Sequence, residues 1–247
     1  MNHRTALVCG KYELSVRPGE AKPCDGEDQA LGYYEYINHR TKETGKNLLC
    51  VQQLISSLPQ GLIVYEPFGG VGAFAALVQG ALKPSSHVMC DIDEDCYNQL
   101  AYAFGGHPGV RITRDNARIH LGREYADLYL CDFPFHTLIR YAEWKAQWQR
   151  MTNQRPKAIV WMDGAISKLH LHTRNYTKAT GYPVTRDPET YAQAMSRRLY
   201  EDTGYSITES AYSWACSYFR AEAVPPGPIP ITRYGEGTGD KGFKWIN

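Results

Sequence analysis

The sequence predicts an α/β fold: a mostly parallel β-sheet covered by helices and ending in an antiparallel strand pair. The first supporting observation is an alternation, between residues 46 and 204, of short apolar runs with longer segments whose apolar residues recur at helical spacing. The second is that residues 205–224 hold two apolar runs with no helix between them. Strands that alternate with helices are typical of a parallel sheet covered on both faces.

The individual elements follow from spacing and from breakers. Leu48, Val51 and Ile55 lie on one helical face, and Pro59 ends that helix. Helices are predicted over residues 46–58, 73–82, 94–104, 138–151 and 188–204. Short apolar runs predict strands over residues 62–66, 87–91, 110–114, 126–132 and 157–163, followed by the final pair.

One main domain is predicted, with a tail at each end. Residues 1–40 are polar with scattered Pro and Gly, which predicts an irregular lead-in or a short hairpin. Residues 41–224 hold the alternating pattern, including a short substrate-loop insertion at 165–187. Residues 225–247 are rich in Pro and Gly and predict an extended arm rather than a further domain.

Composition narrows the class of protein. Hydrophobic residues make up 43 % of the 247 residues, enough for a packed core, and a net charge of +1 gives no overall basic field. A nucleic-acid partner would therefore have to meet a local basic patch. The seven cysteines include no CxxC pair, which disfavours zinc fingers and disulfide frameworks and predicts a reducing, cytoplasmic location. No apolar run reaches the ~18 residues of a membrane span, and no signal peptide is visible, so no membrane partner is predicted.

The stretch "IVYEPFGGVGAF" marks the end of the first predicted strand. Glu66 and Pro67 precede three glycines, Gly69, Gly70 and Gly72, at the turn into the next helix. Glycines let a backbone turn sharply and approach a ligand, and a helix N-terminus favours an anion. A plain structural turn is the alternative.

Polar residues also end the next two predicted strands. Asp91 comes 19 residues after Gly72, where a carboxylate can accept both hydroxyls of a ribose. Asp115 and Asn116 end the third strand and can bind an adenine edge. Each could instead be a solvated strand end or polar turn. Together, three polar ends at one sheet edge favour a nucleotide-like ligand, and the lack of GxGxxG favours an adenosine ligand with a charged amino-acid end over a dinucleotide.

The stretch "CDFPF" follows the fourth strand. Asp132 offers an acceptor, Pro134 a fixed backbone, and Phe135 a stacking surface. A carboxylate and a backbone carbonyl at such a turn can accept both N–H bonds of an amine and so aim its nitrogen lone pair at a ligand. An aromatic ring can hold a flipped base. The alternative is an aromatic cap packed on the core.

The insertion at 165–187 interleaves basic and aromatic residues, which is typical of contacts with phosphates and bases. The candidate substrate-binding residues are His170, His172, Arg174, Tyr176, Lys178 and Arg186. An ordinary surface loop is the alternative. The two histidines have no evident third ligand, so no metal site is predicted.

Four segments resemble the S-adenosylmethionine-dependent methyltransferases. "VYEPFGGVGAF", "CDIDEDC", "TRDNAR" and "LYLCDFPF" are similar to motifs I to IV of that family, in order, over roughly residues 40–163. The closest likeness is to Dam-like DNA adenine methyltransferases. The resemblance implies a Rossmann-like class I methyltransferase fold and S-adenosyl-L-methionine as cofactor.

The resemblance also implies roles for single residues of the cofactor site. Gly69 and Gly72 would approach the methionine part of the cofactor. Asp91 would hold the ribose and Ile92 would pack on the adenine, whose amino group Asp115 would bind.

"DFPF" resembles the DPPY motif of amino methyltransferases. Asp132 is then the acid, Pro134 the second proline and Phe135 the aromatic residue. Phe133 replaces the first proline, which keeps the carbonyl but loses rigidity.

Three functions follow. The first is methylation of an exocyclic amino group, with adenine N6 in DNA as the favoured target and DNA favoured over RNA as partner. The second is methylation of RNA, a protein amide or a small molecule, which the near-neutral charge and short insertion favour. The third is a methyltransferase-like binding or structural module without catalysis, for which Phe133 leaves room. The sequence predicts no oligomeric state.

Overall fold

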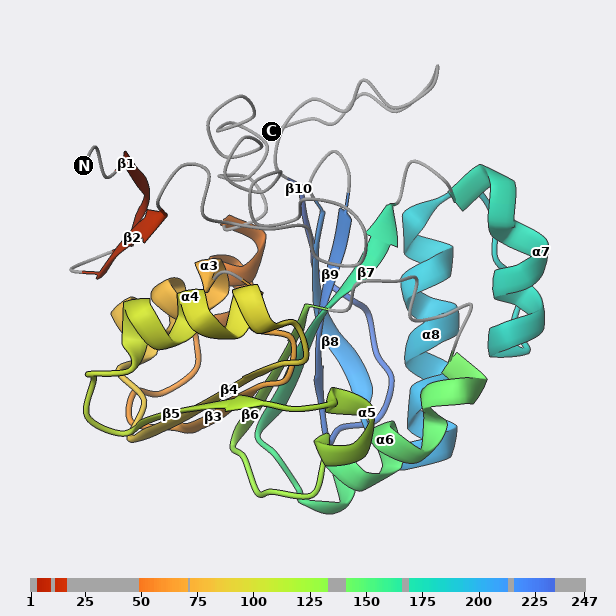
Figure 1. The fold of residues 1–247 in the computed structure, drawn as a ribbon. Coiled ribbons are helices and arrows are strands. Elements are labelled where there is room, and N and C mark those ends of the chain that lie inside the picture. The colour runs from red at the N-terminus through yellow and green to blue at the C-terminus, as the bar shows by residue number, and fades with distance from the viewer. Residues whose placement is uncertain are drawn as a thin grey trace.

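The computed structural model describes residues 4–9, 12–16, 49–70, 72–132, 141–165, 169–212 and 216–233. Its centre is an eight-stranded sheet with the order β10-β8-β9-β7-β6-β3-β4-β5 (Figure 1). The strands are β3 (Ile63–Glu66), β4 (Ser86–Asp91), β5 (Val110–Arg114), β6 (Leu128–Asp132), β7 (Ala158–Ala165), β8 (Ser206–Tyr212), β9 (Cys216–Glu222) and β10 (Ile231–Arg233).

All neighbouring strands run parallel except β9, which is antiparallel to both β7 and β8. The chain builds outward from β3 through β4 to β5, and then crosses back to place β6 on the other side of β3. The order therefore reverses between β3 and β6. In open α/β sheets, ligands bind at the carboxyl ends of the strands at such a reversal.

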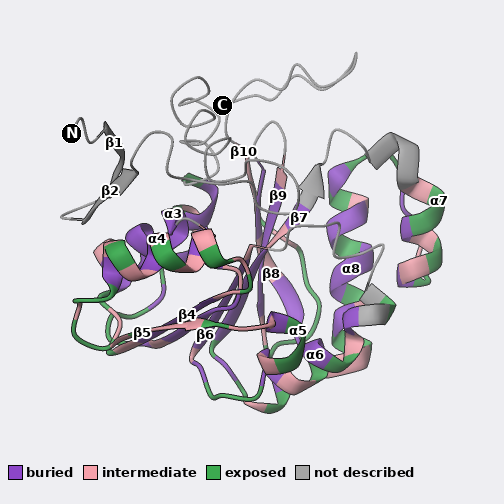
Figure 2. Ribbon diagram, in the orientation of Figure 1, coloured by how far each residue is buried: buried purple, intermediate pink, exposed green. Residues whose placement is uncertain are grey.

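Helices cover both faces of the sheet. The labelled helices are α3 (Ala73–Leu82), α4 (Glu94–Phe104), α5 (Ala117–His120), α6 (Tyr141–Asn153), α7 (Leu169–Thr180) and α8 (Pro188–Thr203), and residues 49–55 form a further one. Helices α3 and α4 lie on one side of the sheet, and α6 and α8 on the other (Figure 1). The strands between them are largely buried (Figure 2), as expected of a parallel sheet with two covered faces.

Each face has its own core. Helix 49–55 and α3 pack on one face, where Leu54 and Leu77 join Val64 and Leu128 in a buried cluster. Aromatic residues dominate the opposite face. There Trp161 of β7 lies between Trp148 of α6, at a ring-centre distance of 5.0 Å, and Phe219 of β9, at 5.3 Å. Both clusters fix the strand ends that carry the predicted site.

The predicted elements agree with this architecture. Helices α3 and α4 have the predicted bounds, and the final strand pair is antiparallel. The predicted α/β sheet is therefore confirmed. No helix within the described ranges is long and apolar enough to cross a membrane.

Three segments differ from, or refine, the expectation. Helix α7 occupies the predicted loop at 165–187, because Tyr176 and Thr180, one turn apart, are buried. Strand β10 forms within the predicted arm and runs parallel to β8, where Ser210 N donates to Pro230 O at 3.0 Å. In the lead-in, β1 (Arg4–Cys9) and β2 (Tyr12–Val16) form the hairpin that was one of its two alternatives.

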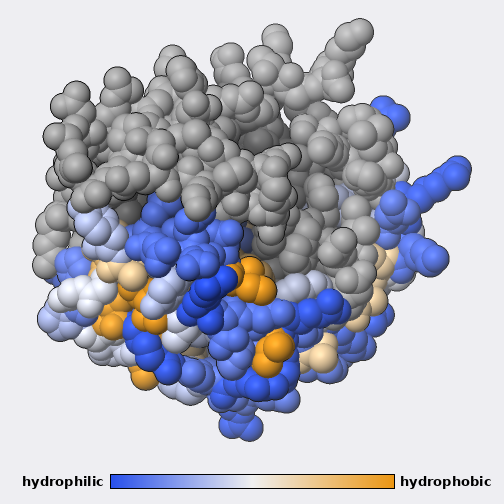
Figure 3. Space-filling view, viewed as in Figure 1, coloured by the Kyte–Doolittle hydropathy of each residue, from blue (hydrophilic) through white to orange (hydrophobic). Residues whose placement is uncertain are grey.

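The described surface in the view of Figure 3 is mainly hydrophilic, with small and separate apolar spots. Large apolar side chains that are exposed include Ile92 at 60 % and Ile119 at 46 %. Ile92 stands beside Asp91 at the end of β4, so its exposure falls at the predicted ligand-binding edge.

Candidate active site

Three carboxyl groups lie in a row across the centre of the sheet. Glu66 is the last residue of β3 and pairs in register with Met89 of β4, so Asp91 is two residues further along on the same face. The register of β3 with β6 places Asp132 in the equivalent position on the other side. Because successive strand residues alternate between faces, Asp91, Glu66 and Asp132 share one face at the reversal point.

Burial and mutual repulsion favour the protonated forms of these acids. Glu66 is only 1 % exposed, and its pKa is raised by burial and by Asp91. The half-buried Asp132 has its pKa raised to about 7 by burial and by Glu66. Burial also raises the pKa of Asp91. A cation bound against this row would relieve the repulsion and stabilise the ionised forms.

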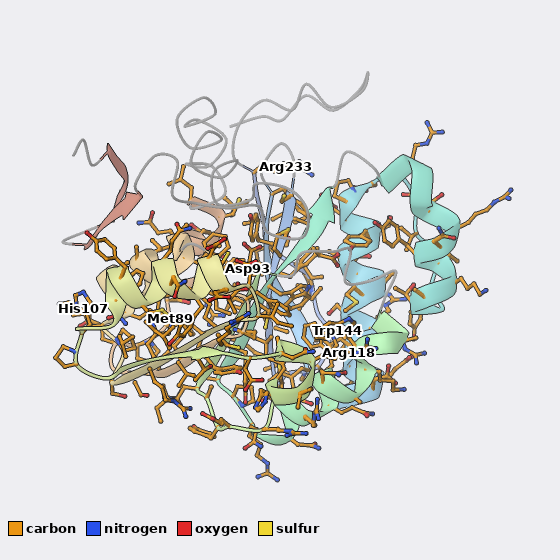
Figure 4. The ribbon with its side chains drawn as sticks, in the orientation of Figure 1. Met89, Asp93, His107, Arg118, Trp144 and Arg233 are labelled. Atoms are coloured by element: carbon orange, nitrogen blue, oxygen red, sulfur yellow. The ribbon has the colours of Figure 1, made fainter. Side chains whose placement is uncertain are left out.

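Asp91 connects β4 to the glycine turn. Its Oδ2 accepts a hydrogen bond from the backbone N–H of Gly70 at 2.9 Å, and its Oδ1 accepts one from Asp93 N at 3.0 Å. Asp93 in turn caps the N-terminus of α4, at the position labelled in Figure 4. Asp91 therefore holds the turn and the start of the next helix together at one edge.

Glycine stands at positions 69, 70 and 72 for different physical reasons. A Cβ on Gly69 would lie 2.7 Å from Leu100, and one on Gly72 would lie 2.6 Å from Phe104. Both glycines therefore allow the turn to pack against α4, a reason that the predicted approach to a ligand did not include. Gly70 has φ +51°, and a Cβ there would meet nothing within 4 Å. Of the three, Gly70 is the one that faces open space.

Asp115 and Asn116 are engaged locally. Asp115 Oδ2 lies 2.7 Å from His120 Nε2, and the Asp115 backbone N–H donates to Asp91 O at 3.0 Å. Asn116 Oδ1 caps α5 by accepting from Arg118 N at 2.9 Å. The backbone thus ties the third strand end to the second. An adenine edge would have to displace or share the side-chain contacts.

Of the remaining predicted residues, Pro67 is buried directly after β3. Phe133, Pro134 and Phe135 lie outside the described residues, which resume at 141, and so do the side chains of His170 and His172. Among the described side chains, no group of three or more His, Cys, Asp or Glu residues could hold a metal.

The substrate segment separates into a buried and an exposed side. Tyr176 is 2 % exposed and packs edge-on against Tyr191 of α8 at a ring-centre distance of 4.9 Å. Its burial does not fit the predicted place at the substrate surface, because Tyr176 is a core residue that docks α7. Arg174, Lys178 and Arg186 are exposed and remain available to a partner.

Sequence reasoning missed two side chains beneath Glu66. His87 Nε2 lies 3.2 Å from Glu66 Oε2, and His87 Nδ1 lies 3.0 Å from Gln79 Nε2. All three residues are buried. The available signal was a histidine in an otherwise apolar strand, "HVMCD", since a buried polar side chain needs a partner.

An aromatic contact joins the glycine turn to two helices. Phe68 packs on Trp144 of α6 at 6.0 Å between ring centres, and the guanidinium carbon of Arg118 lies 5.7 Å from the Trp144 ring centre. Arg118 and Trp144 are labelled side by side in Figure 4. These contacts connect the turn after β3 and helix α5 with α6.

Comparison with solved structures identifies the fold. Trm1 from Pyrococcus horikoshii, in complex with S-adenosyl-L-methionine, matches with a TM-score of 0.59 at 10 % identity, over 88 % of this chain and 61 % of that chain. CalO1, a methyltransferase in calicheamicin biosynthesis in its SAH-bound form, matches with a TM-score of 0.52 at 14 % identity, over 81 % of this chain and 59 % of that chain. No protein-family model and no curated sequence matches the chain.

The chain has the Rossmann-like fold of S-adenosylmethionine-dependent methyltransferases, as predicted. At these identities the likeness concerns the fold alone. Neither structure is described as a DNA adenine methyltransferase, so the finer resemblance to the Dam-like enzymes stays a prediction.

Proposed function

We propose that this chain is an S-adenosylmethionine-dependent methyltransferase that acts on an exocyclic amino group of a nucleic acid. The observation that carries the proposal is the row of Asp91, Glu66 and Asp132 at the point where the strand order reverses. Such a row suits a ligand with cationic groups, and the cofactor carries a sulfonium and an ammonium. Fold and site chemistry thus point to the same ligand.

The cofactor would lie along the carboxyl edge from β6 to β5. Glu66 and the Gly70 turn would hold the methionine end, since a Cβ at Gly70 meets open space. Asp91 would hold the ribose hydroxyls, and the exposed Ile92 would pack on the adenine. Asp115 and Asn116 reach the adenine edge from the end of β5.

Asp132 would orient the acceptor amine. The bound cofactor would supply an electrophilic methyl group and would leave as a neutral thioether, and the proton given up by the amine nitrogen would pass to solvent. Ionised Asp132 and the carbonyl of Phe133 accept the two N–H bonds and so aim the lone pair. Phe135 would stack on the base, as the resemblance to the DPPY motif implies, and Pro134 would restrict the backbone beside it. Positioning of this kind can contribute roughly 7–11 kcal/mol.

The proposed nucleic-acid contact is the exposed side of α7. Arg174 and Lys178 are one helical turn apart on the side opposite the buried Tyr176, and Arg186 follows. His170 and His172 belong to the first turn of the same helix. Adenine N6 in DNA is the first candidate target. RNA is the second candidate, and the near-neutral net charge and the short insertion at 165–187 support it.

The deciding experiment offers methyl-labelled S-adenosylmethionine to DNA, RNA, protein and small-molecule pools in parallel. We expect label in nucleic acid, with N6-methyladenine as the product in DNA. Asp132→Asn should lose transfer while keeping cofactor affinity by calorimetry. Label in protein or small molecules only would redirect the substrate. Cofactor binding without transfer to any pool would favour a binding or structural module without catalysis, the alternative suggested by Phe133 in place of the first proline of the motif. No cofactor binding at all would reject the proposal.

A further inference from the structure

Gln79 and His87 form a buried chain of hydrogen bonds that ends at Glu66. Gln79 belongs to α3, His87 to β4 and Glu66 to β3, so the chain joins three elements. The distances are 3.0 Å from Gln79 Nε2 to His87 Nδ1 and 3.2 Å from His87 Nε2 to Glu66 Oε2. Their exposed fractions are 6 %, 0 % and 1 %. Buried polar side chains of this kind require mutual satisfaction.

The hydrogen bonds of this chain all donate in one direction, from Gln79 through His87 to Glu66. An amide nitrogen only donates, so Gln79 Nε2–H donates to Nδ1 of His87. Burial lowers the pKa of His87 to about 3, so the imidazole is neutral and carries its proton on Nε2. That Nε2–H then donates to Glu66 Oε2. Gln79 thereby selects the tautomer that makes His87 a donor to the carboxyl group.

This chain of hydrogen bonds leaves one carboxyl oxygen of Glu66 without a hydrogen-bond partner among the described residues. Within the described residues, only Oε2 has a hydrogen-bond partner, and no Lys or Arg pairs with this carboxyl group. Asp91 and Asp132 flank it on the same face. Glu66 is therefore a rigidly held acid between two others, with Oε1 free to accept from a ligand at the carboxyl edge.

We propose that Gln79 and His87 are positioning residues that fix the Glu66 carboxyl group as the acceptor for the cationic methionine end of the cofactor. This inference rests on the proposed function and adds two buried residues that act on the cofactor site through Glu66. A hydrogen bond to one carboxyl oxygen prevents the side chain from rotating, so the other oxygen is held ready for a cation. The same neutral donor adds no positive charge that would repel the ligand.

The test compares two ligands in calorimetry: S-adenosylmethionine, and 5′-methylthioadenosine, which keeps the adenosine and sulfur but lacks both cationic groups. His87→Leu removes donor and acceptor. His87→Gln keeps both, because its amide can accept from Gln79 and donate to Glu66. Gln79→Met removes only the donor to Nδ1 at similar length, and it serves if His87→Leu does not fold. Thermal melting of every variant reports the fold.

We expect His87→Leu to weaken S-adenosylmethionine binding by about tenfold or more, since hydrogen bonds to charged groups are the strong ones. Methylthioadenosine binding should stay unchanged, and His87→Gln should restore most of the lost affinity. Gln79→Met should show the same selective loss to a smaller extent. Equal weakening for both ligands would indicate a merely structural role and overturn the inference, as would unchanged affinity for both. If the wild-type protein binds methylthioadenosine but not S-adenosylmethionine, the inference fails together with the proposed function.

Discussion

The carboxyl group of Asp132 lies beside the buried carboxyl group of Glu66 on neighbouring strands, and burial together with this proximity raises the pKa of Asp132 to about 7. The site therefore keeps an acid that is half-ionised near neutral pH. That property links the proposed methyl transfer to pH, and it also links the stability of the fold to pH.

Methyl transfer should rise with pH through about 7, because only ionised Asp132 accepts an N–H bond from the amine. The measurement is the pH profile of single-turnover methyl transfer at saturating cofactor. A flat profile between pH 5.5 and 8.5, chosen to bracket that pKa by roughly 1.5 units on each side, would contradict the role of this carboxylate.

Stability should show the opposite trend. The folded state raises the pKa of Asp132 from 3.8 to about 7, so between these values the folded chain holds a proton that the unfolded chain has released. The free energy of unfolding therefore falls as pH rises across that window. Asp132→Asn cannot titrate and should lose less stability than the wild type between these two pH values. Urea unfolding at both ends of the window measures this, and identical pH slopes would count against the raised pKa.

Substitutions at Gly72 and Gly70 distinguish the packing of the turn on α4 from access to the proposed ligand. Gly72→Ala should destabilise the fold by about 1–3 kcal/mol, because its Cβ would lie 2.6 Å from Phe104 at a φ of +88°. Gly61→Ala is the matched control, with φ +78° and nothing within 4 Å, so it carries the backbone strain alone. Thermal melting should show the larger loss for Gly72→Ala. Equal losses would mean that packing on α4 does not require the glycine.

Gly70 should respond differently from Gly72. A Cβ at Gly70 has open space around it, so a side chain there costs only the strain of φ +51°. Under the proposed function, that side chain would take up space meant for the cofactor. Gly70→Asn tolerates this backbone conformation and should weaken S-adenosylmethionine binding with little loss of melting temperature. Wild-type affinity in this variant would place the cofactor elsewhere.

The basic side of α7 should set the salt dependence of nucleic-acid binding. Replacing Arg174 and Lys178 together by Gln should flatten the slope of log affinity against log salt by roughly 0.9 per lost duplex phosphate contact, or about 1.8 in all. Lys83 and Arg123 provide the control, since both are exposed and precede strands β4 and β6 at the opposite edge of the sheet. Fluorescence anisotropy over a salt series measures both pairs. If the two double variants have equal slopes of log affinity against log salt, α7 does not contact the nucleic acid.

A buried hydrogen bond joins α8, on which α7 packs, to β7. Tyr191 OH donates to Asp163 Oδ2 at 2.5 Å, and both residues are 3 % exposed. Tyr191→Phe should lower the free energy of unfolding by about 1–3 kcal/mol, because a buried acceptor loses its donor. Tyr212→Phe is the control, since its hydroxyl donates to a neutral carbonyl of Pro188 at 3.3 Å. If Tyr191→Phe lowers the free energy of unfolding no more than Tyr212→Phe does, the bond to the Asp163 carboxyl group is no stronger than one to a neutral carbonyl.

Local pattern predicted much of the fold. The alternation of apolar runs predicted the strands and helices that flank the site, and the strand ends marked Asp91 and Asp132. These predictions succeed because a strand buried on both faces must be apolar along its length and turns polar where it leaves the core. Pattern could not foresee α7, whose segment "LHLHTRNYTKAT" has few apolar residues and is held by Tyr176 packing on α8.

The sequence by itself determined most of the strands, the helices other than α5 and α7, and the edge at which the polar strand ends gather, since each depends on the spacing of residues near one another in the chain. Only the tertiary structure decided which side chains meet across that edge. The pairing of Gln79 with His87 and Glu66, the packing of Gly69 and Gly72 on α4, and the joining of β10 to β8 all depend on strand register and helix docking. Register and docking are set by the whole packed core, because only complete burial of both sheet faces fixes one arrangement among many.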